Sequence, residues 1–161
     1  GEYGGRIIIP SYSESNQLNY FIARTYENAY HKYKNPEVSK DIIFFENFIN
    51  WNQPIVLCEG VFDAIAIKRN AIPILGKSLS NTLIKKIIAS NNKDIYIALD
   101  LDARVKALKI SEQFLSYGKI VFLVDLTDKD PSDMGFDNFT KLVQTAKELD
   151  LGSLMMHKLN L

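Results

Sequence analysis

Acidic side chains follow several apolar segments of this sequence, at the points where strands are expected to end. Glu59 follows the run IVLC, Asp100 and Asp102 lie in ALDLD, and Asp130 lies in DKDPSD after KIVFLV. Clustered carboxylates repel each other and raise each other's pKa unless a cation neutralises their charge. Oxygen ligands without His or Cys suit a hard divalent ion, so the pattern indicates Mg²⁺ or Mn²⁺. Two such ions can clamp the reacting oxygens of a phosphoryl transfer.

Local spacing adds two expectations and one alternative. Residues two apart on a strand share a face, so Asp100 and Asp102 should point the same way. Gly60 should let the chain turn sharply after Glu59, and Asp63, one turn into the next helix, should support the site from behind. A single Asp at a strand end is more often a turn residue or a helix cap, and that alternative stays open for Asp63, and for Asp125 and Asp128.

The elements that must position these carboxylates alternate along residues 54–150. Strands are expected at 54–60, 71–76, 94–102 and 119–126, and helices at 61–70, 78–91, 103–118 and 134–150. Nearly continuous apolar strands that alternate with helices predict an α/β fold with a roughly four-stranded parallel sheet and helices on both faces. Ligands of such sheets bind at the carboxyl ends of the strands, where the acidic residues lie.

The remaining residues divide into a small α+β segment before the sheet and a short tail after it. Residues 1–53 are expected to hold strands at 6–12 and 18–26, a polar loop at 27–40 and a short helix at 41–51. Residues 151–161 are expected to be a tail or the end of a helix. The abrupt start, GEYGGRIIIP, suggests a fragment of a longer polypeptide, and its lack of a signal-peptide pattern suggests a cytoplasmic protein.

Composition limits the classes of partner and cofactor. The 161 residues carry 19 basic and 19 acidic side chains, so a polyanionic partner would need a local basic patch or metal ions. The single cysteine, Cys58, excludes an internal disulfide and a multi-cysteine zinc site, and its apolar surroundings predict a buried, inert thiol. No apolar run reaches the length of about 18 residues that a membrane span needs.

The order of the acidic motifs resembles the Toprim domain. That domain is the phosphoryl-transfer module of bacterial-type DNA primases, type IA and II topoisomerases, OLD-family nucleases and RecR-type proteins. CEGVFDA looks like the primase form of its Glu motif, with Glu59 in the catalytic position, and ALDLDA looks like its metal-binding pair. DKDPSD looks like its last acidic motif, where Asp130 matches best and Asp133 is offset by one residue from the bacterial spacing.

The upstream segment is also similar to primases of bacteria and phages. GGRIIIPSYSESNQLNYFIARTY and KYKNP resemble the stretch just before Toprim, which implies nucleic-acid contacts by Arg24, Lys32 and Lys34. LGKSLS resembles the loop after the second strand, where Lys77 would contact a phosphate or nucleotide. A solvated loop is the alternative for these lysines. ARVK departs from the Gly-rich residues that follow the Asp pair in bacterial primases.

The resemblance implies a DNA primase catalytic domain that makes RNA primers on a single-stranded DNA template from ribonucleoside triphosphates. The resemblance also implies two Mg²⁺ or Mn²⁺ ions at the site, and a replicative helicase as a partner that binds regions outside this chain. If the source is a phage, the protein would act in the cytoplasm of the host. The implied catalytic residues are Glu59, Asp100 and Asp102, and the implied metal ligands are these three with Asp130 and Asp133. A Toprim nuclease or topoisomerase-type phosphodiester cleavage, and a non-catalytic nucleic-acid-binding module, are the alternatives.

Overall fold

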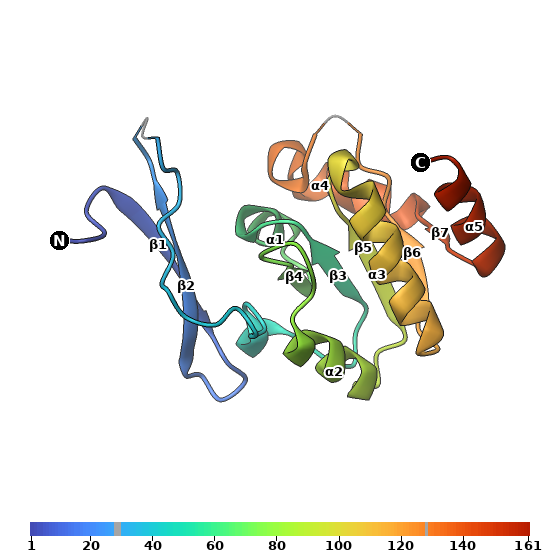
Figure 1. Cartoon of the computed structure of the whole chain (residues 1–161), viewed down its shortest axis with the longest axis horizontal. Helices are drawn as coiled ribbons and strands as arrows, with labels where there is room; N and C mark the ends of the chain where they lie inside the picture. The colour runs from blue at the N-terminus through green and yellow to red at the C-terminus, as the bar shows by residue number, and fades with distance from the viewer. Residues whose placement is uncertain (28–29, 128) are drawn as a thin grey trace.

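A β-hairpin stands beside a five-stranded sheet that carries helices on both faces (Figure 1). The computed structural model describes residues 1–27, 30–127 and 129–161. The strands are β1 (Arg6–Tyr12), β2 (Leu18–Thr25), β3 (Ile55–Cys58), β4 (Ala71–Pro73), β5 (Asp94–Ala98), β6 (Ile120–Leu123) and β7 (Lys147–Glu148). The helices are η1 (Glu46–Phe48), α1 (Val61–Ile67), α2 (Asn81–Ala89), η2 (Leu101–Ala103), α3 (Arg104–Ser116), α4 (Pro131–Thr145) and α5 (Leu151–Leu159).

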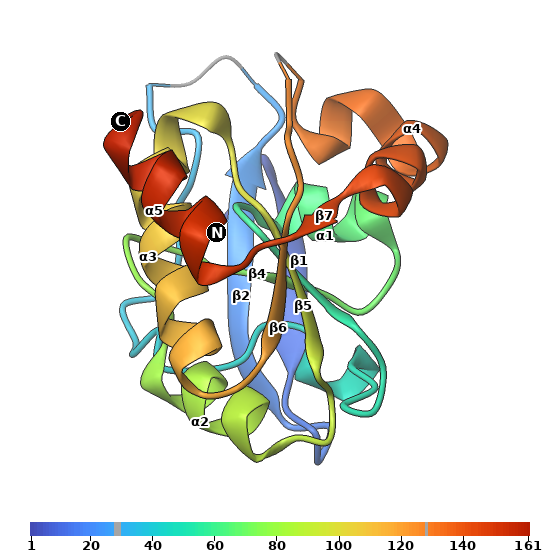
Figure 2. The same ribbon diagram turned by 90° about the vertical axis from the view of Figure 1, so that its right-hand side faces the viewer.

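The sheet has the strand order β4-β3-β5-β6-β7, in which the first four strands are parallel and β7 is antiparallel. Side chains alternate between the two faces. Ile55 and Leu57 of β3 pack in a core with α2, α3 and α5, whereas Val56 and Cys58 pack in a second core with α1 and α4. Figure 2 shows these two groups of helices on opposite sides of the strands. The predicted α/β architecture is confirmed.

Two elements at the C-terminal end were not predicted. β7 pairs with β6 as a fifth, antiparallel strand, and residues 151–159, expected as a tail or helix end, form the separate helix α5. A two-residue strand has no sequence period to detect. α5 begins at Asp150, whose side chain accepts a hydrogen bond from Ser153 N at 2.6 Å, and Leu154 buries the helix against the core.

The hairpin has the predicted strands, but the segment after it differs from the prediction. Tyr20 and Ile22 of β2 pack with Phe44 and with Val61 of α1. The helix expected over 41–51 is helical only in η1, because Phe45, just before it, has a left-handed backbone (φ 61°) that ends any regular helix there. Phe44 is buried between the hairpin and α1, so the segment serves as packing between them.

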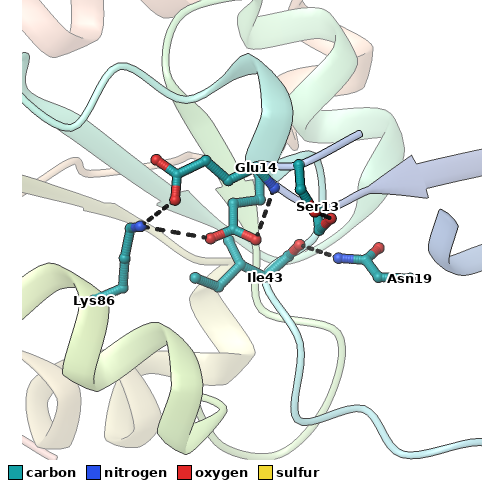
Figure 3. A network of polar contacts seen from close by, with 7 residues as sticks. Ser13, Glu14, Asn19, Ile43 and Lys86 are labelled. Atoms are coloured by element: carbon teal, nitrogen blue, oxygen red, sulfur yellow. Dashed lines mark hydrogen bonds and ion pairs between the residues drawn. The ribbon is translucent and has the colours of Figure 1, made fainter. Parts of the chain in front are cut away.

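A polar network holds the tip of the hairpin against the sheet domain (Figure 3). Lys86 of α2 places its Nζ atom 2.5 Å from Glu14 Oε2 and 3.9 Å from Glu46 Oε1. Glu46 also accepts a hydrogen bond from the Glu14 backbone at 3.2 Å, and Asn19 donates to the carbonyl of Ile43 at 3.1 Å. One ammonium group therefore joins three segments that are distant in the sequence.

Within the described ranges, no helix is long and apolar enough to cross a bilayer.

Candidate active site

The carboxyl ends of β3 and β5 bring Glu59 and Asp100 to the same rim of the sheet. The two strands are parallel neighbours, and Cys58 is paired with Ala98 in their register. The alternation of faces continues past β5, since Leu99 belongs to the core under α3, and Glu59, after β3, is paired with Lys106 of α3. Glu59 therefore lies on the side of α3, and Asp100 lies on the side of α1 and α4.

Glu59 binds protein partners with only one of its two oxygens. Its Oε1 lies 3.5 Å from the Nζ atom of Lys106, which also donates a 2.6 Å hydrogen bond to the carbonyl of Gly76. Its Oε2 is buried and accepts no hydrogen bond from the part of the chain that the structure describes. The chain bends at Glu59 and Gly60 between β3 and α1, as expected, but Gly60 has an ordinary extended backbone (φ −128°), so this turn does not need the conformational freedom of glycine. A Cβ atom at Gly60 would instead lie 3.3 Å from Asp63 Oδ2, which favours glycine through close packing.

Asp100 has the most perturbed carboxylate of the rim. Burial, as the largest cause, and the negative charges of Glu59, Asp63, Asp130 and Asp102 together raise its pKa from 3.8 to about 6. Its Oδ1 atom is buried without a hydrogen-bond partner among the described residues. Because these four charges all act on Asp100, the structure brings the acidic residues of three strand ends into one electrostatic cluster.

Asp102 does not continue a strand. β5 ends at Ala98, and Asp102 lies in η2, where it is exposed. The expectation that Asp100 and Asp102 lie on one face of a strand is therefore wrong, because the strand ends before Asp100 and a turn of 3-10 helix begins between the two residues. The side chain of Asp102 lines a cleft of about 900 Å³ together with Glu59, Lys77 and Lys106.

Asp63 links the first turns of two helices. Its Oδ2 accepts a hydrogen bond from Gly60 N at 3.0 Å, and its Oδ1 accepts one from Ser132 N, in α4, at 3.2 Å. Burial raises the pKa of Asp63, and the two backbone hydrogen bonds oppose that rise. Asp63 thus joins the starts of α1 and α4 next to Glu59, and its bond to Gly60 N is a contact with the start of its own helix, as the alternative for this residue supposed.

The last acidic motif acts first as a helix cap. Asp130 is the N-cap of α4, and its Oδ1 accepts hydrogen bonds from Asp133 N and Ser132 Oγ, both at 2.8 Å. Asp133 is exposed in the first turn of that helix. Asp125 is paired with Arg104 at 3.3 Å, and its side chain is 80% exposed. Asp128 lies outside the described residues.

One observation indicates that the carboxylates of the rim could bind a hard cation. Two buried carboxylate oxygens, Glu59 Oε2 and Asp100 Oδ1, have no hydrogen-bond partner in the described chain, and such atoms are costly unless a cation or donor meets them. Among the described residues, however, no group of three or more His, Cys, Asp or Glu side chains is arranged to hold one ion. In this structure Glu59 is paired with Lys106, and Asp130 caps its own helix.

Sequence reasoning missed Lys106. Its side chain is 18% exposed and reaches across the rim from α3 to Glu59 and Gly76. Its place in the first turn after the Asp pair, in the stretch ARVK, was the available signal. The predicted thiol state of Cys58 is confirmed, because Cys58 is fully buried and its burial, reinforced by the nearby carboxylates, holds the thiol pKa well above its usual range.

The four basic residues that were predicted to contact nucleic acid or nucleotide lie in different places. Arg24 and Lys32 line a cleft of about 600 Å³ between the hairpin and Phe62 of α1. The guanidinium of Arg24 stacks 4.6 Å from the ring centre of Phe62 and 5.7 Å from that of Tyr33.

The two other predicted lysines lie outside this cleft. Lys34 is 3.0 Å from Glu2 Oε1 and stacks on Tyr3. Lys77 is exposed and lines the cleft beside Glu59.

Comparison with known proteins identifies the fold and the relatives. No family model matches the chain. A DNA primase of Thermotoga maritima is 29% identical over 168 residues, which span 92% of this chain and 30% of that protein. The Aquifex aeolicus primase, solved with its zinc-binding and RNA polymerase domains, is 25% identical over 92% of this chain and 42% of its own, with a TM-score of 0.75. A DnaG primase catalytic domain bound to single-stranded DNA is 20% identical, with a TM-score of 0.78, over 96% of this chain and 56% of its own.

The chain spans less than a third of the length of that Thermotoga relative and about half of the solved catalytic domains. The similarity to primases in sequence and the agreement of the fold both extend over nearly all of its own length. The resemblance found from the acidic motifs is therefore confirmed: the chain is related to the DNA primases and has the fold of their Toprim-containing catalytic core.

Proposed function

We propose that this chain is the Toprim-containing catalytic part of a DNA primase, which joins ribonucleotides into primers on a single-stranded DNA template. The observation that carries the proposal is the pair of buried, unpartnered oxygens of Glu59 and Asp100 at the carboxyl edge of a parallel sheet. The similarity to a DNA primase over 92% of the chain supports the same function.

Carboxylates of the rim would hold the divalent ions. Glu59 and Asp100 offer their free oxygens, Asp102 lies in η2, and Asp130 lies at the N-terminus of α4, with Asp133 in the first turn of that helix. When bound, two Mg²⁺ or Mn²⁺ ions would neutralise the clustered charge and polarise the phosphate of the incoming nucleotide. Asp100 must be ionised to bind a cation, and its raised pKa in the metal-free chain means that a proton competes with the cation for this carboxylate at pH values near and below about 6.

The remaining site residues have supporting roles in this proposal. Glu59 would act as a ligand or as the general base for the primer hydroxyl, and Asp63 fixes the turn after it through the bond to Gly60. Lys77 lies in the cleft that Glu59 lines, where its charge suits the phosphates of a ribonucleoside triphosphate. A replicative helicase would be bound by regions outside this chain, and the reaction would take place in the cytoplasm.

The template would lie along the cleft between the hairpin and α1. Arg24 and Lys32 supply positive charge there, and Phe62 and Tyr33 supply aromatic surface on which bases can stack. Lys34, which is paired with Glu2, would contribute less. The chain as a whole is neutral, so this local arrangement has to provide the attraction to DNA.

Primer synthesis by the complete protein tests the proposal. With single-stranded DNA, ribonucleoside triphosphates and Mg²⁺, we expect the substitution Asp100→Asn to abolish primers, because one of the free oxygens and its charge are lost. Asp137→Asn, on the exposed side of α4, removes a charge outside the site and should leave synthesis unchanged. Normal synthesis by Asp100→Asn would overturn the assignment. Nicking of plasmid DNA in Mn²⁺ without primer synthesis would point to a Toprim nuclease instead.

A further inference from the structure

Lys106 joins three parts of the rim through one ammonium group. It projects from the first turn of α3, places Nζ 3.5 Å from Glu59 Oε1 after β3, and donates at 2.6 Å to the carbonyl of Gly76 after β4. Gly76 and Lys77 form part of the loop between β4 and α2, which lines the cleft of about 900 Å³ with Glu59. The lysine therefore fixes the loop and the carboxylate relative to each other.

The contact also distinguishes the two oxygens of Glu59. Oε1 faces the ammonium group, whereas Oε2 is buried with no hydrogen-bond partner among the described residues. A carboxylate held at one oxygen cannot rotate freely, so its second oxygen keeps a defined direction. The positive charge of Lys106 also offsets part of the repulsion between Glu59 and the neighbouring aspartates, because it lies closer to Glu59 than bulk counterions do.

We infer that Lys106 is a positioning residue of the proposed active site: it holds Glu59 by Oε1 and the Gly76–Lys77 loop by its carbonyl, and so presents Glu59 Oε2 to the divalent ion. This inference rests on the proposed function for its effect on the reaction. Its effect on Glu59 is independent of that function and can be measured in the metal-free chain.

A double-substitution cycle in the metal-free chain tests the contact itself. Lys106→Met should lower the unfolding temperature of the chain in EDTA, because Glu59 loses its counter-charge. In a Glu59→Gln background the same substitution should lower it by less than half as much, since the repulsion that Lys106 offsets is already gone. Equal losses in both backgrounds would show that Lys106 acts only through Gly76 and would overturn the inference. Lys106→Gln, which keeps a hydrogen-bond donor without charge, serves where the Met variant does not fold.

Metal binding gives a second readout with an unusual direction. Lys106→Met removes a positive charge beside the carboxylates, so Mn²⁺ measured by calorimetry should bind the chain roughly three- to tenfold more tightly. Primer synthesis by the complete protein should nevertheless fall about tenfold at saturating metal, because Glu59 and the loop are no longer held. Lys106→Arg, which keeps both the charge and the donors, should restore most of the rate. A rate of primer synthesis by Lys106→Met that equals the wild-type rate at saturating Mn²⁺ would overturn the inference.

Lys109 provides the matched control. It lies one turn further along α3, is exposed, and lines the same cleft without reaching Glu59. Lys109→Met should change Mn²⁺ affinity much less than Lys106→Met and should leave the unfolding cycle with Glu59→Gln additive. A wild-type protein that makes no primers would refute the proposed function, whereas the unfolding cycle would still decide whether Lys106 holds Glu59.

Discussion

The substitution Asp100→Asn should stabilise the metal-free chain while destroying its response to metal. The raised pKa of Asp100 means that its ionised form is disfavoured in the folded protein. A shift from 3.8 to about 6 corresponds to an upper limit of about 3 kcal/mol at about 1.4 kcal/mol per pH unit. Since the side chain is only partly buried and solvent screens its charge, we expect about 1 kcal/mol, or about 3 °C in unfolding temperature.

The pH dependence has a definite sign. Between about pH 4 and pH 6 the folded chain binds the Asp100 proton more tightly than the unfolded chain does, so folding stability falls as the pH rises through this window. The advantage of Asp100→Asn should therefore be absent below about pH 4, grow up to about pH 6 and stay constant above it. Asp100 makes no side-chain cap hydrogen bond to η2, so the amide loses no bond that the carboxylate made.

Thermal unfolding followed by circular dichroism provides the assay, in EDTA and in Mg²⁺ at several pH values. Mg²⁺ should raise the unfolding temperature of the wild-type chain, because a ligand that binds only the folded state stabilises it, and should have little effect on Asp100→Asn. Asp137→Asn should follow the wild type throughout. The reasoning is refuted if Asp100→Asn is less stable than the wild type in EDTA near neutral pH, or if Mg²⁺ stabilises both chains equally.

Three further substitutions test other parts of the structure. Asn70→Ala should lower the free energy of unfolding, measured with denaturant, by about 2 kcal/mol. The Asn70 side chain, on a residue with φ 24°, accepts one backbone hydrogen bond at 2.7 Å and donates others at 2.8 and 3.0 Å. A loss near zero would contradict this. Arg24→Gln should weaken binding of single-stranded DNA and reduce the salt slope of log K by about 1, whereas Lys34→Gln should do so less; equal effects in a filter-binding assay would speak against the proposed template cleft. Lys86→Met should lower the unfolding temperature in low salt by an amount equivalent to less than about 1 kcal/mol and by less in high salt, and exposed Lys85→Met should not; a salt-independent loss would rule out the ion pairs as its cause.

The parallel sheet was predictable because its strands are apolar on both faces and its helices begin and end at recognisable residues. Ser80 caps α2 by accepting a hydrogen bond from Leu83 N at 3.1 Å, and Gly118, with φ 76°, follows the end of α3. Elements that depend on distant partners were not predictable. β7 exists only by pairing with β6, and the segment 41–51 takes its shape from Phe44, which is buried against the hairpin and α1.

The candidate site was predictable as a set of positions but not as a set of contacts. The order of Glu59 and Asp100 on neighbouring strand ends follows from the strand-helix alternation, and the structure places both on one rim. The sequence could not show that Asp130 turns to its own helix or that Asp102 lies beyond the end of its strand. Lys106 was missed because a lysine in the first turn of a helix usually faces solvent, and only the fold brings Glu59 and Gly76 within its reach.

The carboxylate of Asp63 couples the position of α1 to that of α4. Because it accepts hydrogen bonds from the backbone of Gly60 and of Ser132 at once, we expect a displacement at the start of α4 to move the residue next to Glu59 as well. Changes in the segment after β6 should therefore alter the geometry on the far side of β5 without any direct contact between the two.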